Sequence, residues 1–247
     1  MSSFESNQDR INYMMMPAII SLEGNIGAGK TTLLEHLRER YPEGNEEGIL
    51  FLKEPVDLWE QVKDGEGETM LSKFYADSAK YAFPFQIMAY ASRLKTLREL
   101  VLANPGARVV VCERSLEADK HIFAKMLHDE GKIEDVCYQI YEMFFGDSAG
   151  LFRLSGVIYV DSDAEVCAER IAKRAREGET IPLDYLRKCR EYHEAWLRPR
   201  ASDGLQQQKQ QSILHLNTNM DATYVGESDP GVQWLNHAVA FIAKVSR

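Results

Sequence analysis

The chain lacks several patterns that would place it in a large class of proteins. Its four cysteines show no C-x-x-C spacing, so no metal ribbon or redox motif is predicted, and we expect reduced thiols inside the fold. They are Cys112, Cys137, Cys167 and Cys189. The six histidines have no metal-ligand spacing, which leaves no predicted zinc site. No apolar run is long enough to span a membrane, so no membrane partner is expected.

Basic residues are also scarce. The 29 Lys and Arg residues are outnumbered by 38 Asp and Glu residues, for a net charge of -9, and this balance argues against nucleic-acid binding. Residues 1–13 are polar and lack the pattern of a signal or transit peptide. We therefore expect a cytoplasmic protein with a flexible segment 1–16, followed by a single domain over residues 17–247.

One glycine-rich segment carries the strongest positive signal. Residues 24–31 have the sequence GNIGAGKT, which matches the G-x-x-x-x-G-K-[ST] loop that cradles nucleotide phosphates. Glycines let backbone N–H groups approach phosphate oxygens, Lys30 is expected to reach the terminal phosphates, and Thr31 is expected to ligate Mg²⁺. The predicted ATP-binding residues of this P-loop are Gly24, Asn25, Ile26, Gly27, Ala28, Gly29, Lys30, Thr31 and Thr32.

Apolar runs that predict strands alternate along the chain with segments of helical periodicity. The predicted strands are residues 18–22, 49–52, 108–112, 156–160 and 213–216, and the main predicted helices are residues 83–102, 121–130, 133–145, 183–197 and 232–245. Residues 161–163 are predicted to cap a further helix. Residues 206–211 are a predicted loop, and residues 219–230 either a loop or a lid over a pocket. The alternation predicts an α/β fold, with a five-stranded parallel sheet flanked by helices.

Charged residues follow two predicted strands at the points where parallel sheets bind ligands. Glu54 comes after the second strand, and Glu113 and Arg114 come after the third. A carboxylate facing the phosphates suits a general base for an acceptor hydroxyl, and Glu113 suits a metal ligand. Glu54 taken alone is equally compatible with a surface carboxylate in a turn.

Three arginines form a cluster on and after one predicted helix. Arg170 and Arg174 share a helix face, and Arg176 follows them. Such a cluster suits clamping of triphosphate charge, which predicts an Arg-rich lid that binds ATP. The alternative is a solvated basic helix paired with neighbouring glutamates.

These segments, in their order and spacing, resemble one family. The segments are EGNIGAGKT at residues 23–31, KEPV at 53–56 with Trp59, FQ at 85–86 leading to SR at 92–93, ERS at 113–115 with Asp119 and Phe123, the arginine cluster, and IPLDYL at 181–186. Together they are similar to the deoxynucleoside kinases, in particular the deoxycytidine and deoxyguanosine kinases. The resemblance implies a P-loop kinase of nucleotide salvage and DNA precursor synthesis, with ATP and Mg²⁺ as cofactors and a homodimer as the assembly.

The resemblance also implies a role for each matching residue. Glu54 matches the general base that accepts the proton of the substrate 5′-hydroxyl, with Lys30, Arg114 and Glu113 as the other catalytic groups. Tyr75 and Glu179 match the pair that binds the deoxyribose 3′-hydroxyl, although Glu177 stays an alternative to Glu179. The implied substrate-binding residues are Glu54, Trp59, Tyr75, Gln86, Arg93, Arg114, Asp119, Phe123 and Glu179.

Base choice depends on three further positions. Ala89, Arg93 and Asp119 resemble the version of the pocket that accepts deoxycytidine or purines, whereas thymidine-accepting members have apolar residues there. A buried Arg–Asp pair offers polar contacts to an amino-bearing base and leaves less apolar room for a methyl group. The alternative is a structural ion pair with little influence on specificity.

Two other functions share the P-loop. A nucleoside monophosphate kinase of the thymidylate kinase type would need a basic group where this chain has Glu54. The other is a nucleotide-driven switch or motor that hydrolyses ATP or GTP. A switch GTPase would need an N-K-x-D motif, which the sequence lacks, and a motor usually has extra domains or an assembly surface. For a homodimer, the predicted helices 83–102 and 133–145 are candidate interface elements.

Overall fold

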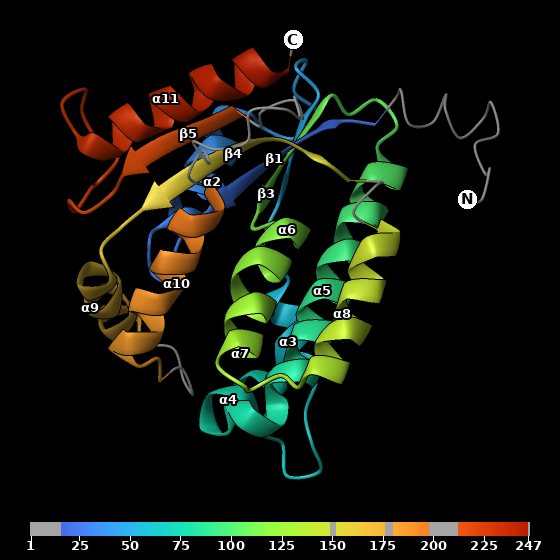
Figure 1. The fold of residues 1–247 in the computed structure, drawn as a ribbon. Coiled ribbons are helices and arrows are strands. Elements are labelled where there is room, and N and C mark those ends of the chain that lie inside the picture. The colour runs from blue at the N-terminus through green and yellow to red at the C-terminus, as the bar shows by residue number, and fades with distance from the viewer. Residues whose placement is uncertain (1–15, 149–151, 176–179, 198–211, 247) are drawn as a thin grey trace, which may run out of the picture.

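A parallel sheet forms the centre of the molecule. The computed structural model describes residues 16–148, 152–175, 180–197 and 212–246, so the predicted flexible segment 1–16 lies almost entirely outside the described residues. Within these ranges the sheet has five parallel strands in the order β2-β3-β1-β4-β5 (Figure 1). The strands are β1 (Ala18–Glu23), β2 (Ile49–Leu52), β3 (Val109–Glu113), β4 (Leu154–Asp161) and β5 (Ser212–Asn217). The predicted α/β class and its five strands are therefore confirmed.

Helices connect successive strands and cover the sheet. They are α2 (Lys30–Arg40), α3 (Val56–Gln61), α4 (Met70–Ala76), α5 (Ser78–Ala103), α6 (Leu116–Ala118), the π-helix η1 (Asp119–Ala124), α7 (Lys125–Asp129), α8 (Asp135–Ser148), α9 (Ala164–Arg174), α10 (Leu183–Leu197) and α11 (Pro230–Val245). The helices α5 and α8 run side by side, and α11 lies along β5 (Figure 1). No helix among the described residues is long and apolar enough to cross a membrane.

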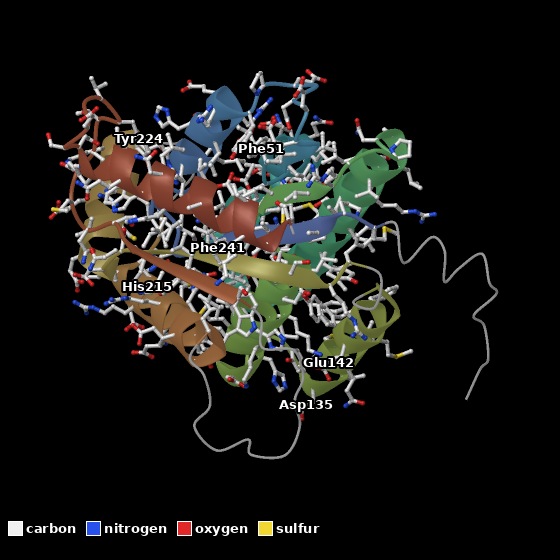
Figure 2. All side chains as sticks on the ribbon, turned by 90° about the horizontal axis from the view of Figure 1, so that it is seen from above. Phe51, Asp135, Glu142, His215, Tyr224 and Phe241 are labelled. Atoms are coloured by element: carbon white, nitrogen blue, oxygen red, sulfur yellow. The ribbon has the colours of Figure 1, made fainter. Side chains whose placement is uncertain are left out.

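The alternation of side chains along β1 explains the two layers of core. Ile20 and Leu22 belong to a cluster with leucines of α2 and with Phe241 of α11, whereas Ile19 packs with Leu97 of α5 on the opposite face. Successive side chains of a strand point to opposite faces, so a continuous apolar run is required when both faces are covered. Figure 2 shows α11, with Phe241, lying across the β4–β5 side of the sheet.

Three local predictions differ from the structure. The helix predicted at residues 83–102 begins at Ser78, because Asp77 caps it and accepts a hydrogen bond from Lys80 N at 3.1 Å; Pro84 lies within the helix and not at its start. The helix predicted at 121–130 begins at Leu116, where Ser115 supplies the cap. Asp163 precedes α9 as predicted, but its side chain makes no capping bond and instead accepts from Asn219 Nδ2 at 3.0 Å.

The cysteine prediction is confirmed. All four thiols are free, three of them buried and Cys137 half-buried. The predicted loop at residues 206–211 lies outside the described residues.

Candidate active site

A cleft of about 700 Å³ opens at the carboxyl ends of the strands. Its walls come from the P-loop, the ends of β2 and β3, helices α3 to α5, η1, α9 and α10, and the segment after β5. Ligands of open parallel sheets bind at this edge. The predicted site residues that line the cleft are Ile26, Gly27, Ala28, Gly29, Lys30, Thr31, Thr32, Glu54, Trp59, Tyr75, Gln86, Arg93, Glu113, Arg114, Asp119, Phe123, Arg170 and Arg174.

Two predicted residues of the described part of the chain, Gly24 and Asn25, do not line the cleft. Gly24 lies beneath the loop at a φ of 146°, where a Cβ would collide with the carbonyl oxygen of Val160. Asn25 is buried and its Nδ2 donates to Leu186 O at 2.8 Å, which ties the P-loop to α10. Arg176 and Glu179 lie outside the described residues, as does Glu177. Gly24 and Asn25 therefore fix the P-loop to the neighbouring elements of the fold.

The P-loop positions its lysine through the backbone. Lys30 is the first residue of α2, and its Nζ donates to the carbonyl oxygen of Asn25 at 2.7 Å. Burial and the charge of Arg114 lower the pKa of Lys30 to about 8, against the opposing effect of Glu113. Gly29 precedes the helix at a φ of 98°, a left-handed conformation that favours glycine. The result is a buried cation at the helix N-terminus, where anions bind.

Thr31 and Glu113 meet across the loop. The Thr31 hydroxyl donates to Glu113 Oε1 at 2.5 Å. The two residues come from the start of α2 and the end of β3, which are brought together because β3 pairs with β1, the strand that enters the P-loop. The Thr31 hydroxyl oxygen and the Glu113 carboxylate therefore lie together beside Lys30.

Two arginines contact one oxygen of Glu54. Arg93 Nη2 lies 3.0 Å and Arg114 Nε lies 3.2 Å from Glu54 Oε1. Burial raises the pKa of this carboxyl, but the charges of Arg114, Arg93 and Lys30 outweigh burial, and the net pKa is lowered. Glu54 is therefore ionised at neutral pH, in a position beside the phosphate loop. The structure therefore does not show the alternative, in which Glu54 is a surface carboxylate in a turn.

Arg93 also forms a buried ion pair with Asp119. Its Nε donates to Asp119 Oδ2 at 2.9 Å, and its Nη1 donates to Glu113 O at 3.2 Å. Burial raises the pKa of Asp119 in spite of the opposing charge of Arg93. The guanidinium is thus shared between Asp119, Glu54 and the end of β3. The sequence predicted the pair with Asp119 but not the contact with Glu54.

Aromatic side chains wall the inner end of the cleft. Trp59 packs edge-on against Phe85 at 5.6 Å between ring centroids, and its Nε1 donates to Ser92 Oγ at 2.8 Å. Phe123 lies with the Arg114 guanidinium 4.7 Å above its ring. Gln86 is only 2% exposed, and its Oε1 has no hydrogen-bond partner among the described residues. Aromatic walls together with this unpaired amide oxygen suit a nucleobase edge.

At the outer end of the cleft, Arg170 is engaged with the segment after β5. Its Nη1 donates to Ser162 Oγ at 3.1 Å and its Nη2 to Met220 O at 2.9 Å, with Asp221 3.7 Å away. Arg174, one turn later, also lines the cleft. Of the predicted Arg-rich lid, these two residues lie in the described part of the chain and face the cleft.

Sequence reasoning missed several residues of the cleft. Tyr185 appeared only within a family motif, yet it lines the cleft from α10. Met220, Asp221, Ala222, Tyr224 and Trp234 line its outer end. The sequence indicated this end of the cleft only through the polar segment 219–230, which is predicted as a loop or a lid. It carries no motif, and its place beside the P-loop depends on the position of β5.

Comparison with known proteins bears on this cleft. The family model described as deoxynucleoside kinase matches residues 20–228. The Fowlpox virus protein named "Probable deoxycytidine kinase FPV151" is 31% identical over 92% of this chain and 88% of its own. The mitochondrial deoxyguanosine kinase of Xenopus laevis is 29% identical over 94% and 92%, respectively, and human deoxycytidine kinase is 30% identical over 82% and 84%. The resemblance found in the sequence is thus confirmed, and the chain belongs to the deoxynucleoside kinase family.

Proposed function

We propose that this ATP-dependent deoxynucleoside kinase transfers the γ-phosphate of ATP to the 5′-hydroxyl of a deoxynucleoside, with Glu54 as the general base. The observation that carries the proposal is the position of Glu54. Its ionised carboxylate shares the cleft with Lys30 of the P-loop. A base must lie within hydrogen-bonding reach of the proton that it accepts. Arg114, on the same carboxylate oxygen, is then also near the attacking oxygen and the transferred phosphoryl group.

The donor phosphates would bind over the P-loop. Lys30 and the backbone N–H groups of residues 26–32 would contact the β- and γ-phosphates, and Arg174 would neutralise charge from the opposite side. Thr31 and Glu113 fit a Mg²⁺ site, because they offer two hard oxygen donors and Mg²⁺ usually takes its other ligands from phosphates and water. When bound there, Mg²⁺ would neutralise charge on the donor phosphates.

The acceptor nucleoside would bind at the aromatic end. Phe123 would stack on the base, Trp59 would close the pocket, and the unpaired Oε1 of Gln86 would accept from an amino or imino group of the base. Tyr75, which lines the same end from α4, would bind the 3′-hydroxyl. Glu179 is its proposed partner.

We further propose that deoxycytidine or deoxypurines are preferred over thymidine. Arg93 and Asp119 are both at least 97% buried beside Ala89 in the wall of the base pocket. A thymine methyl group directed at this pair would have to displace or desolvate charged groups, which costs roughly 1–3 kcal/mol per unmatched group.

The proposal includes a homodimer with α5 and α8 at its interface. Apolar side chains of α8 that are exposed in the single chain, Met143 and Phe144 among them, support it.

The experiment is an ATP and Mg²⁺ assay with deoxycytidine, deoxyadenosine, deoxyguanosine, thymidine and thymidine monophosphate, for the wild type and Glu54→Gln. We expect turnover of a nucleoside, and a loss of kcat of about 10²- to 10⁴-fold in the variant, the usual contribution of a general base. Thymidine turned over as efficiently as deoxycytidine would remove the proposed base preference. Turnover of the monophosphate alone would favour the monophosphate kinase instead.

A further inference from the structure

The turn after β3 holds Arg114 in an unusual backbone conformation. Arg114 has a φ of 63°, in the left-handed region that non-glycine residues rarely adopt. Its N–H still donates to Leu22 O at 3.0 Å, which continues the pairing between β1 and β3 for one more residue. Such a conformation persists only where the surrounding structure fixes the chain on both sides. The Leu22 bond fixes the N-terminal side.

A buried hydrogen bond fixes the C-terminal side. The Ser115 hydroxyl donates to Glu23 Oε1 at 2.6 Å, and its oxygen accepts from Ala118 N at 3.0 Å as the cap of α6. Glu23 is the last residue of β1 and its side chain is completely buried. The single hydroxyl therefore joins β1 to α6 across the strained residue. Because the hydroxyl hydrogen is directed to Glu23, the cap and the bond to the carboxylate are both satisfied at once.

Glu23 has no other assigned task in the cleft. It does not line the cleft, and its Oε2 has no hydrogen-bond partner among the described residues. Burial raises its pKa, while the Ser115 hydrogen bond, the charge of Arg114, the Ser21 hydroxyl and the charge of Arg93 act in the opposite direction. A buried carboxyl of this kind is costly, since its oxygens are removed from water and Oε2 is left without a hydrogen-bond partner among the described residues. Because burying this carboxyl is unfavourable, we expect Glu23 to have a function.

We propose that Glu23 is a positioning residue for Arg114, acting through the Ser115 hydroxyl to hold the strained turn that directs the Arg114 guanidinium to Glu54. The inference rests on the proposed role of Arg114 in phosphoryl transfer. A guanidinium held between Phe123 and Glu54 contributes to the transition state only in one orientation. When the turn relaxes, Arg114 keeps its charge, but its guanidinium is no longer directed to Glu54.

The test measures kcat and KM for ATP and for deoxycytidine, or for the natural deoxynucleoside that the wild type turns over fastest. Glu23→Ala and Ser115→Ala remove the two ends of the bond, and each is expected to lower kcat about tenfold or more with both KM values within about threefold. Glu23→Gln retains an acceptor oxygen for Ser115 and is expected to keep kcat within about threefold. If Glu23→Ala does not fold, Ser115→Ala and Glu23→Gln still test the proposal.

A double-mutant cycle separates positioning from general damage. Arg114→Ala alone is expected to lose about 100-fold or more in kcat, and adding Glu23→Ala should then cost no more than about twofold, because the group to be positioned is gone. Ile20→Val, at a fully buried position of β1 that does not line the cleft, controls for lost stability. Its kcat should equal that of the wild type.

Each contrary result has one meaning. If Arg114→Ala retains the wild-type kcat, the proposed role of Arg114 fails and the inference fails with it. If Arg114→Ala is impaired but Glu23→Ala and Ser115→Ala keep the wild-type kcat, only the positioning role is overturned. The same holds if Glu23→Ala costs an equal factor in the Arg114→Ala background.

Discussion

At the residue scale, Arg93 contacts both a base-pocket residue and the proposed general base, two groups that the sequence alone does not connect. Its guanidinium contacts Asp119 in the base pocket and Glu54 at the transfer site. Removing Arg93 alone would leave Asp119 buried and unpaired, which is strongly destabilising, and would also raise the pKa of Glu54. A test of base selection therefore has to remove both members of the pair.

The double variant Arg93→Met, Asp119→Ala replaces a buried ion pair by apolar volume. We expect the ratio of kcat/KM for thymidine to that for deoxycytidine to rise about tenfold or more, since one unmatched polar group is worth roughly 1–3 kcal/mol. Steady-state kinetics with the two nucleosides check this, and Asp119→Asn serves as the control that keeps a polar group. An unchanged ratio would leave the pair with a structural role only.

Much of the cleft could be predicted at the residue scale because its residues follow strands. Glu54 lies two residues after β2, Glu113 ends β3 and Arg114 directly follows it, and the register of a parallel sheet brings such ends together. Glu23 could not be predicted in the same way. It ends β1 directly before the P-loop motif, and the contact that gives it significance, with Ser115, joins residues 92 positions apart.

At the element scale, the strands were predictable and the short helices were not. The strands are continuous apolar runs, which a sheet covered on both faces requires. The helices α3 and α4 have six and seven residues, too few turns for a periodic pattern, so the sequence gives no sign of them. Both wall the acceptor side of the cleft through Trp59, Leu71 and Tyr75.

The segment between β5 and α11 is an ordered element in its own right. Asp229, the cap of α11, accepts from Thr223 N, Thr223 Oγ1 and Tyr224 N as well as from Gly231 N. These bonds lower the pKa of Asp229 to about 2, with those from Thr223 the largest cause. They hold Tyr224 stacked on His36 of α2, at 4.0 Å between ring centroids, and Figure 2 shows Tyr224 beside the first turn of α11.

Asp229→Ala should loosen this segment and so affect the donor side of the cleft. We expect KM for ATP to rise about fivefold with KM for the nucleoside unchanged, because the residues that the segment contributes lie next to the P-loop. The matched control is Thr69→Ala, which removes the cap of α4 on the acceptor side. It should raise KM for the nucleoside and spare that for ATP. Equal effects of both variants on both KM values would contradict this division of the cleft.

At the scale of the whole molecule, apolar surface collects away from the cleft. A groove of about 650 Å³ lies along α5, with Leu94 and Leu102 of α5 and Phe144 of α8 in its wall beside the charged residues Lys95, Arg98 and Glu99. Met143 is 72% exposed, and Val136 and Ile140 are exposed on the same helix. Large apolar side chains gathered on one face are typical of a surface that binds another molecule. A second copy of the chain, paired about a twofold axis, would cover this apolar face on each of the two copies.

Met143→Glu tests the homodimer, because a charge placed in an apolar interface must be desolvated or exposed by dissociation. We expect light scattering after size exclusion to give twice the chain mass for the wild type and the single-chain mass for the variant, at micromolar protein. Since Met143 is largely exposed in the single chain, the variant should fold normally and keep its circular dichroism spectrum. Val62→Glu, at an exposed apolar position just after α3 that belongs to neither α5 nor α8, should remain dimeric. A wild type of single-chain mass would overturn the dimer, and a dimeric Met143→Glu would move the interface to another face of the molecule.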